Sequence, residues 1–153
     1  LGYGHPRLTA LNGSHTALVP ENVAIIGARD IDLSEIPLVQ ELAVRVYTMS
    51  EIDRRGAANC FQEAIDHVSQ NTDGIHLSFD LDGVDPREAP GVGTPVPGGL
   101  SLRESHLICE MLCETKKLIG MEMVELNPIL DTANQTGQLA VWLIQSALGK
   151  TIL

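Results

Sequence analysis

The stretch HLSFDLDGVDPREAPGVGTPVPGGL, residues 76–100, joins an apolar run to three aspartates and then to a loop rich in glycine and proline. The aspartates are Asp80, Asp82 and Asp85, and the nearest cation in sequence is Arg87. Two carboxylates about 4 Å apart repel by about 1 kcal/mol in water and about 4 kcal/mol near a protein surface. Either these side chains point apart into solvent, or a cation from outside the chain lies among them.

The apolar run at residues 74–79 predicts a buried strand whose end carries the aspartates. Because side chains alternate along a strand, His76, Ser78, Asp80 and Asp82 are expected to share one face. Carboxylate oxygens are natural ligands of Mg, Ca and Mn, so the pair favours a divalent cation over a merely solvated strand end. An EF-hand does not fit, because Gly83 comes too early. Spacing alone leaves nucleotide-sugar transferases and aspartate-nucleophile phosphatases open.

The loop from Asp85 to Leu100 holds four prolines and four glycines. Prolines restrict the chain, and glycines allow the backbone to approach a ligand. Strong strand and helix patterns flank this segment. We therefore expect an ordered loop at a binding site and not a flexible linker.

Strands and helices are predicted to alternate on either side of this stretch. Apolar runs predict further strands at residues 23–28, 45–48 and 118–126, and helical periodicity predicts helices near 57–68, at 101–115 and after Asp131. Ser50 with Asp53 resembles a capping box, and Asp131 is a plausible N-cap. The alternation predicts a parallel sheet with packed helices, either open or half of a barrel, and ligands at the carboxyl ends of its strands.

Composition restricts the range of partners. The 153 residues fit a single domain, 1–153, and 10 basic against 20 acidic residues give a net charge of −10. That charge disfavours nucleic acid and anionic membranes, and no run of 18 apolar residues predicts a membrane span. Three cysteines without a C-x-x-C pair suit a reducing, cytoplasmic location. The opening residues LGYGHPRL contain no initiator Met, so the chain looks cut at its front end.

Two long stretches, SFDLDGVDPREAPGVGTPVPGGLSLRE at 78–104 and MVELNPILD at 123–131, resemble the ureohydrolase family and, within it, the arginases. The resemblance covers nearly the whole chain in motif order and identifies the carboxyl-terminal half of such an enzyme. It implies an α/β fold, a three-layer parallel sheet with helices on both faces, of which this chain supplies roughly half. The implied reaction is manganese-dependent hydrolysis of L-arginine to L-ornithine and urea.

The same resemblance assigns roles to individual residues. Asp80 would bridge two Mn²⁺ ions and Asp82 would bind one of them, whereas Asp85 would hold the loop. Glu125 resembles the carboxylate that receives the substrate guanidinium, and Thr94 lies in the loop that lines that pocket. The segment IGARDIDLSE, residues 26–35, resembles the part of arginases that reads the α-amino group of arginine; the residues concerned are Asp32 and Glu35.

The family pattern is incomplete in this chain. The family's G-G-D-H and D-A-H-x-D metal motifs and its S-G-N-x-H-G motif do not occur in the sequence. We therefore expect an amino-terminal half to be missing, the chain alone to bind Mn²⁺ weakly, and its arginase activity alone to be small. Agmatinase or another guanidino hydrolase remains an alternative, as does a non-catalytic half that assembles with partners. The family resemblance also implies a homo-oligomer, a trimer or a hexamer.

Overall fold

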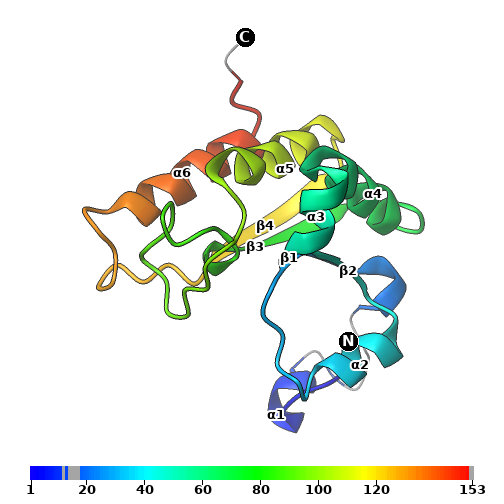
Figure 1. Ribbon diagram of the computed structural model, residues 1–153. Coiled ribbons are helices and arrows are strands. Elements are labelled where there is room, and N and C mark those ends of the chain that lie inside the picture. Colours follow the sequence, from blue (N-terminus) through cyan, green and yellow to red (C-terminus); the bar gives the residue numbers. More distant parts are fainter. Residues whose placement is uncertain (12, 14–17, 152–153) are drawn as a thin grey trace.

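The computed structural model describes residues 1–11, 13 and 18–151, and it alternates strands with helices as predicted (Figure 1). The elements in chain order are α1 Pro6–Thr9, η1 Pro20–Asn22, β1 Ala24–Ala28, α2 Ile36–Leu42, β2 Arg45–Thr48, α3 Met49–Arg55, α4 Ala57–Ser69, β3 Ile75–Asp80, η2 Leu81–Gly83, α5 Leu102–Glu114, β4 Leu118–Val124 and α6 Gln135–Ala147.

The strands form two parallel pairs. β1 pairs with β2, and β3 pairs with β4; within the described residues the two pairs share no strand hydrogen bonds. Helices α3 to α6 lie on one side of the strands, whereas α2 lies on the other side of β1 and β2 (Figure 1). This α/β arrangement with parallel strands confirms the predicted fold class.

The core lies between the strands and the helices α4, α5 and α6. β3 alternates as expected, with Ile75 and Phe79 buried and His76, Ser78 and Asp80 exposed. The apolar faces of the helices supply buried side chains to the same core cluster: Phe61, Ile65, Ile108, Leu112, Leu139 and Leu143. Burial of such side chains supplies most of the stability of a domain of this size.

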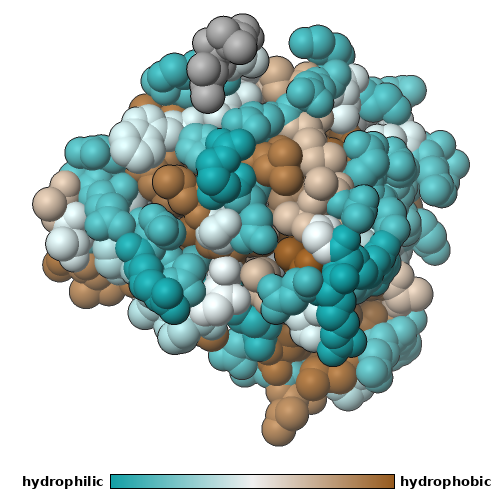
Figure 2. Space-filling view, turned by 45° about the horizontal axis from the view of Figure 1, so that its top comes forward, coloured by the Kyte–Doolittle hydropathy of each residue, from teal (hydrophilic) through white to brown (hydrophobic). Residues whose placement is uncertain are grey.

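The outer surface over the helices is largely hydrophilic, with hydrophobic residues in between (Figure 2). Trp142 and Leu148 of the α6 region are among the exposed hydrophobic residues. In the part of the chain that the structure describes, no helix combines the length and the apolar character that a membrane crossing needs.

Two predicted helix starts are wrong by a few residues. Thr48, and not Ser50, caps α3, since its side chain accepts a hydrogen bond from the Glu51 amide. α6 begins at Gln135, so Asp131 is not its N-cap. The Asp131 carboxylate nevertheless accepts hydrogen bonds from the amides of Thr136 and Gly137 at 3.0 and 3.1 Å. It therefore satisfies free amides of the first helical turn from outside the helix.

The loop after β3 is ordered by specific contacts, as predicted. The Asp85 carboxylate accepts hydrogen bonds from the Gly98 amide at 2.8 Å and the Arg87 amide at 3.1 Å, and these bonds lower its pKa. A bridge between Val84 and Leu100 closes the loop at its base. Asp85 thus holds the loop architecture.

Candidate active site

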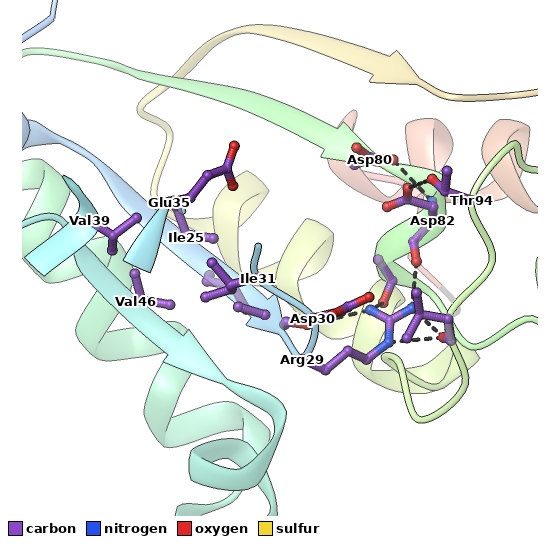
Figure 3. A pocket seen from close by; sticks show the side chains of 15 residues that line it. Ile25, Arg29, Asp30, Ile31, Glu35, Val39, Val46, Asp80, Asp82 and Thr94 are labelled. Atoms are coloured by element: carbon purple, nitrogen blue, oxygen red, sulfur yellow. Dashed lines mark hydrogen bonds between the residues drawn. The ribbon is translucent and has the colours of Figure 1, made fainter. Parts of the chain in front are cut away.

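A cavity of about 410 Å³ runs along β1 from Ile25 to Ala28 and reaches the carboxyl end of β3 at Asp80 (Figure 3). Four of the six residues predicted for the site line it: Glu35, Asp80, Asp82 and Thr94. Asp32 and Glu125 are outside this lining. Ligands of parallel α/β proteins bind at the carboxyl ends of the strands, which is where Asp80 and Asp82 border the cavity.

The two aspartates reach the cavity from different elements. β3 ends at Asp80, and the chain then turns into the short helix η2, so the expectation that Asp82 continues the strand face is wrong. The turn has a local cause, because Asp80 Oδ1 accepts a hydrogen bond from the Asp82 amide at 3.0 Å. Both carboxylates still line the same cavity.

The neighbourhood of Asp80 is electrostatically unfavourable for a carboxylate. Partial burial of its carboxyl group raises the pKa of Asp80 although the residue as a whole is exposed, and the charges of Asp82 and Glu125 raise it further against the opposing hydrogen bond from the Asp82 amide. The Asp82 carboxylate accepts a hydrogen bond from Thr94 Oγ1 at 2.8 Å. The site thus concentrates negative charge, as the sequence predicts, and it suits a bound cation.

Glu125 directly follows β4 and has a backbone φ of 65°. This left-handed conformation is uncommon for residues other than glycine, and such strain often marks a functional position. Its Oε2 would lie 3.7 Å from a β-carbon built on Gly93, which places the carboxylate beside the loop that carries Thr94. The Asp80 pKa shift also reflects the nearby Glu125 charge.

Asp32 and Glu35 lie in the turn between β1 and α2. The Asp32 carbonyl accepts a hydrogen bond from the Glu35 amide at 2.8 Å, which closes a turn just before the helix. Both side chains are exposed, and Glu35 reaches the cavity from the side opposite Asp80 (Figure 3). The turn therefore carries two carboxylates that remain available to a ligand.

The donor set fits part of a manganese site. Carboxylate oxygens suit Mn²⁺, and Asp80 with Asp82 provides two such groups at one cavity. Within residues 1–11, 13 and 18–151, no three His, Cys, Asp or Glu side chains lie close enough to hold a metal ion. The two aspartates would therefore need further ligands to complete a metal centre.

Sequence reasoning missed Arg29, whose guanidinium also lines the cavity. It donates hydrogen bonds to the backbone carbonyls of Asp82 at 2.6 Å and Val96 at 2.6 Å. Backbone acceptors carry no sequence signal. The one feature of the sequence that could have drawn attention to Arg29 is its position directly after the predicted strand at residues 23–28.

Comparison with known proteins gives one consistent family. The arginase family model matches residues 8–149. The arginase of Brevibacillus brevis is 54% identical over 153 residues, which cover 100% of this chain and 51% of that protein. This chain spans about half the length of the curated relatives it matches.

Solved structures agree in fold. The arginase of Bacillus caldovelox matches with a TM-score of 0.97 and 48% identity, covering 100% of this chain and 51% of that one. The arginase of Entamoeba histolytica, solved in complex with L-ornithine, matches with a TM-score of 0.85 and 33% identity, covering 95% and 48%. The family match, the relatives and the acidic cavity at the strand ends lead to one conclusion: the chain belongs to the arginase family.

Proposed function

We propose that this chain carries the substrate-binding part and some of the metal ligands of an enzyme that hydrolyses L-arginine to L-ornithine and urea. The observation that carries the proposal is the cavity at the strand ends, where Asp80, Asp82 and Thr94 face Glu35 in a chain of the arginase family. The complementing residues would come from a second polypeptide segment that matches the other half of the relatives. In the reaction, water replaces the ornithine nitrogen on the guanidinium carbon, and urea leaves.

Both ends of L-arginine find carboxylate partners in this arrangement. A guanidinium is a planar fork of donors, and the Glu125 carboxylate can answer it with two charge-assisted hydrogen bonds. The α-amino group at the other end would bind Asp32 and Glu35, whose side chains are exposed on the turn before α2. Thr94 directly follows Gly93, beside which the Glu125 carboxylate lies, and its hydroxyl donates to Asp82. The substrate would thus be held across the cavity by opposite charges.

Asp80 and Asp82 would hold manganese, together with ligands from the complementing segment. When bound, Mn²⁺ lowers the pKa of water and stabilises developing charge at the reaction centre. The contribution of this chain is to hold the two carboxylates in place: Asp80 accepts a hydrogen bond from the Asp82 amide, and Asp82 accepts one from the Thr94 hydroxyl. Both contacts leave further carboxylate oxygens free to bind a metal.

The first test is urea release by the purified chain with Mn²⁺ and L-arginine. We expect little or no urea from the chain alone, because two aspartates do not complete two metal coordination spheres. Mixing it with a polypeptide that covers the unmatched half of the Brevibacillus brevis arginase should produce urea and ornithine in equal amounts. Colorimetric urea and amino-acid analysis measure both products.

Rapid urea release by the chain alone would contradict the idea of a partial site. The complementing polypeptide alone, and the mixture without Mn²⁺, are the controls. Failure of the mixture to act on any guanidino compound, despite formation of a complex, would contradict the proposed function.

Agmatinase activity is the alternative reaction, and a direct comparison of the two substrates distinguishes them. Agmatine is arginine without the α-carboxylate and keeps the primary amine, so a carboxylate that binds this amine does not by itself select arginine. Loss of the proposed bond to the amine in Asp32→Ala should raise KM for L-arginine about tenfold or more in the reconstituted enzyme, because a charge-assisted hydrogen bond is lost. Steady-state kinetics with both substrates measure the effect.

Asp73→Ala serves as the matched control, because Asp73 is exposed just before the opposite end of β3. An unchanged KM for L-arginine in Asp32→Ala would count against α-amino recognition. Preference for agmatine in the unsubstituted enzyme would favour the alternative.

A further inference from the structure

Arg29 connects three segments that meet at the cavity. It follows β1 directly, and its guanidinium donates to the carbonyls of Asp82, Gly83 and Val96 (Figure 3). The distances are 2.6 Å from Nη2 to Asp82 O, 3.3 Å from Nη1 to Gly83 O, and 2.6 and 3.0 Å from Nη2 and Nε to Val96 O. One side chain therefore ties the end of β1 to the turn after β3 and to the loop that carries Thr94.

No other hydrogen bond of the described residues joins these segments. Among the described residues, β1 and β3 are not hydrogen-bonded to each other. In the same part of the chain, every hydrogen bond that joins residues 18–48 to residues 74–150 comes from Arg29. Apart from the packing of Leu100 beside Gly27, this guanidinium is therefore the direct polar link between the end of β1 and the turn with Asp82.

The guanidinium is committed to the backbone although acidic side chains are near. Asp30, Glu35, Asp80 and Asp82 line the same cavity, yet the ion pairs of the described residues involve other arginines. Hydrogen bonds from a charged donor are stronger than neutral ones, and the planar fork of arginine can serve several carbonyls at once. With the longer contact from Nη1 to Gly27 O at 3.5 Å, each of its five donors faces a carbonyl oxygen, so none is offered to a substrate.

Asp82 is held at three points in this arrangement. Its carbonyl accepts from Arg29, its amide donates to Asp80, and its carboxylate accepts from Thr94. The backbone is thus held on both sides of the residue, and the side chain is held at its end. Loss of one of these contacts would let the carboxylate turn away from the cavity.

We infer that Arg29 is a positioning residue, which holds the Asp82 turn and the Thr94 loop against the end of β1 so that the Asp82 carboxylate faces the metal position. The inference rests on the proposed function where it calls Asp82 a metal ligand. The hydrogen bonds by which Arg29 holds the backbone do not depend on the proposed function. A lysine in its place keeps the charge but offers a single point of donation in place of a fork.

The test compares Arg29→Lys with the matched control Arg103→Lys, whose side chain is exposed on α5 and pairs with Glu110. Hydrogen exchange is measured on the whole 153-residue chain. In Arg29→Lys we expect about tenfold faster exchange at the amides of Asp82, Gly98 and Leu100, because the loss of one charge-assisted bond corresponds to that factor. The amides of Ile75 and Ser105, which bond to Lys117 and Ser101, should keep their exchange rates, as should the thermal midpoint.

A second measurement follows paramagnetic broadening of the amide signals of residues 80–83 as Mn²⁺ is added. Arg29→Lys should require about tenfold more Mn²⁺ for the same broadening, whereas Arg103→Lys should match the unsubstituted chain. Faster exchange at all amides with a lower midpoint would overturn the inference, since Arg29 would then be merely structural, and so would unchanged exchange at Asp82 and Gly98. Absence of broadening at residues 80–83 in the unsubstituted chain would instead contradict the proposed metal site, while the exchange comparison would still decide whether Arg29 acts as a clamp.

Discussion

Glutamine in place of Glu125 is expected to lower kcat/KM for L-arginine by about 100-fold or more in the enzyme reconstituted from this chain and its complementing half. A carboxylate can accept two parallel charge-assisted hydrogen bonds from a guanidinium. Glutamine has one acceptor oxygen, and its amide nitrogen would face a donor of the substrate. A loss of about 3 kcal/mol, the upper end for hydrogen bonds to a charged group, corresponds to a factor of about 100.

The substitution is suited to the position, because glutamine has the same shape as glutamate. The left-handed backbone at φ 65° should therefore be as well tolerated as before, and folding should not change. Glu114→Gln is the control, since Glu114 is exposed at the end of α5, away from the cavity. Thermal unfolding of both variants checks their folding, and the rate of urea formation over a range of arginine concentrations gives kcat/KM. A value within a few-fold of the unsubstituted enzyme for Glu125→Gln would contradict the assignment of the guanidinium to Glu125.

Local sequence patterns predicted the strands well, because their signals lie within a few residues. The four apolar runs became β1 to β4, and the periodic faces near Phe61 and Leu139 became buried faces of α4 and α6. The acidic cluster at the end of β3 was placed correctly for the same reason. Alternation failed only where a local hydrogen bond from the Asp82 amide to Asp80 turned the chain into η2.

What sequence could not predict depends on contacts between distant segments. The two strand pairs do not join directly in the described chain, since pairing is set by tertiary packing and not by strand propensity. Arg29 escaped notice because its partners are carbonyl oxygens 53 to 67 residues away. Asp131 was recognised as a signal for the start of a helix. Its hydrogen bonds to the amides of Thr136 and Gly137 depend on the turn before α6, which the sequence pattern does not specify.

Gly99 differs from the other glycines of the loop, Gly91, Gly93 and Gly98, because it alone among them packs against backbone atoms. Gly99 faces the backbone on the far side of the loop base: a β-carbon there would lie 2.6 Å from Gly83 O, 2.7 Å from the Val84 carbonyl carbon and 2.8 Å from the Asp85 amide nitrogen. Backbone atoms cannot move aside as a flexible side chain can. A side chain at this position therefore forces the two strands of the loop base apart.

Alanine at Gly99 is accordingly expected to lower the free energy of unfolding by about 3 kcal/mol, the upper part of the range for overpacking a close contact. Separation of the loop base breaks the hydrogen bonds from Leu100 N to Gly83 O and from Asp85 N to Leu100 O, at 3.0 and 2.9 Å. Urea denaturation of the chain, followed by circular dichroism, measures the change. Gly83→Ala is the matched control, because a β-carbon at Gly83 meets no atom within 4 Å; we expect it to change the stability by less than about 1 kcal/mol. Equal stability of the two variants would contradict this expectation, because it would mean that the backbone at the loop base can move to accommodate a side chain at Gly99. The loop that brings Thr94 to Asp82 would then be held by the hydrogen bonds of Arg29 and Asp85 and not by close packing at Gly99.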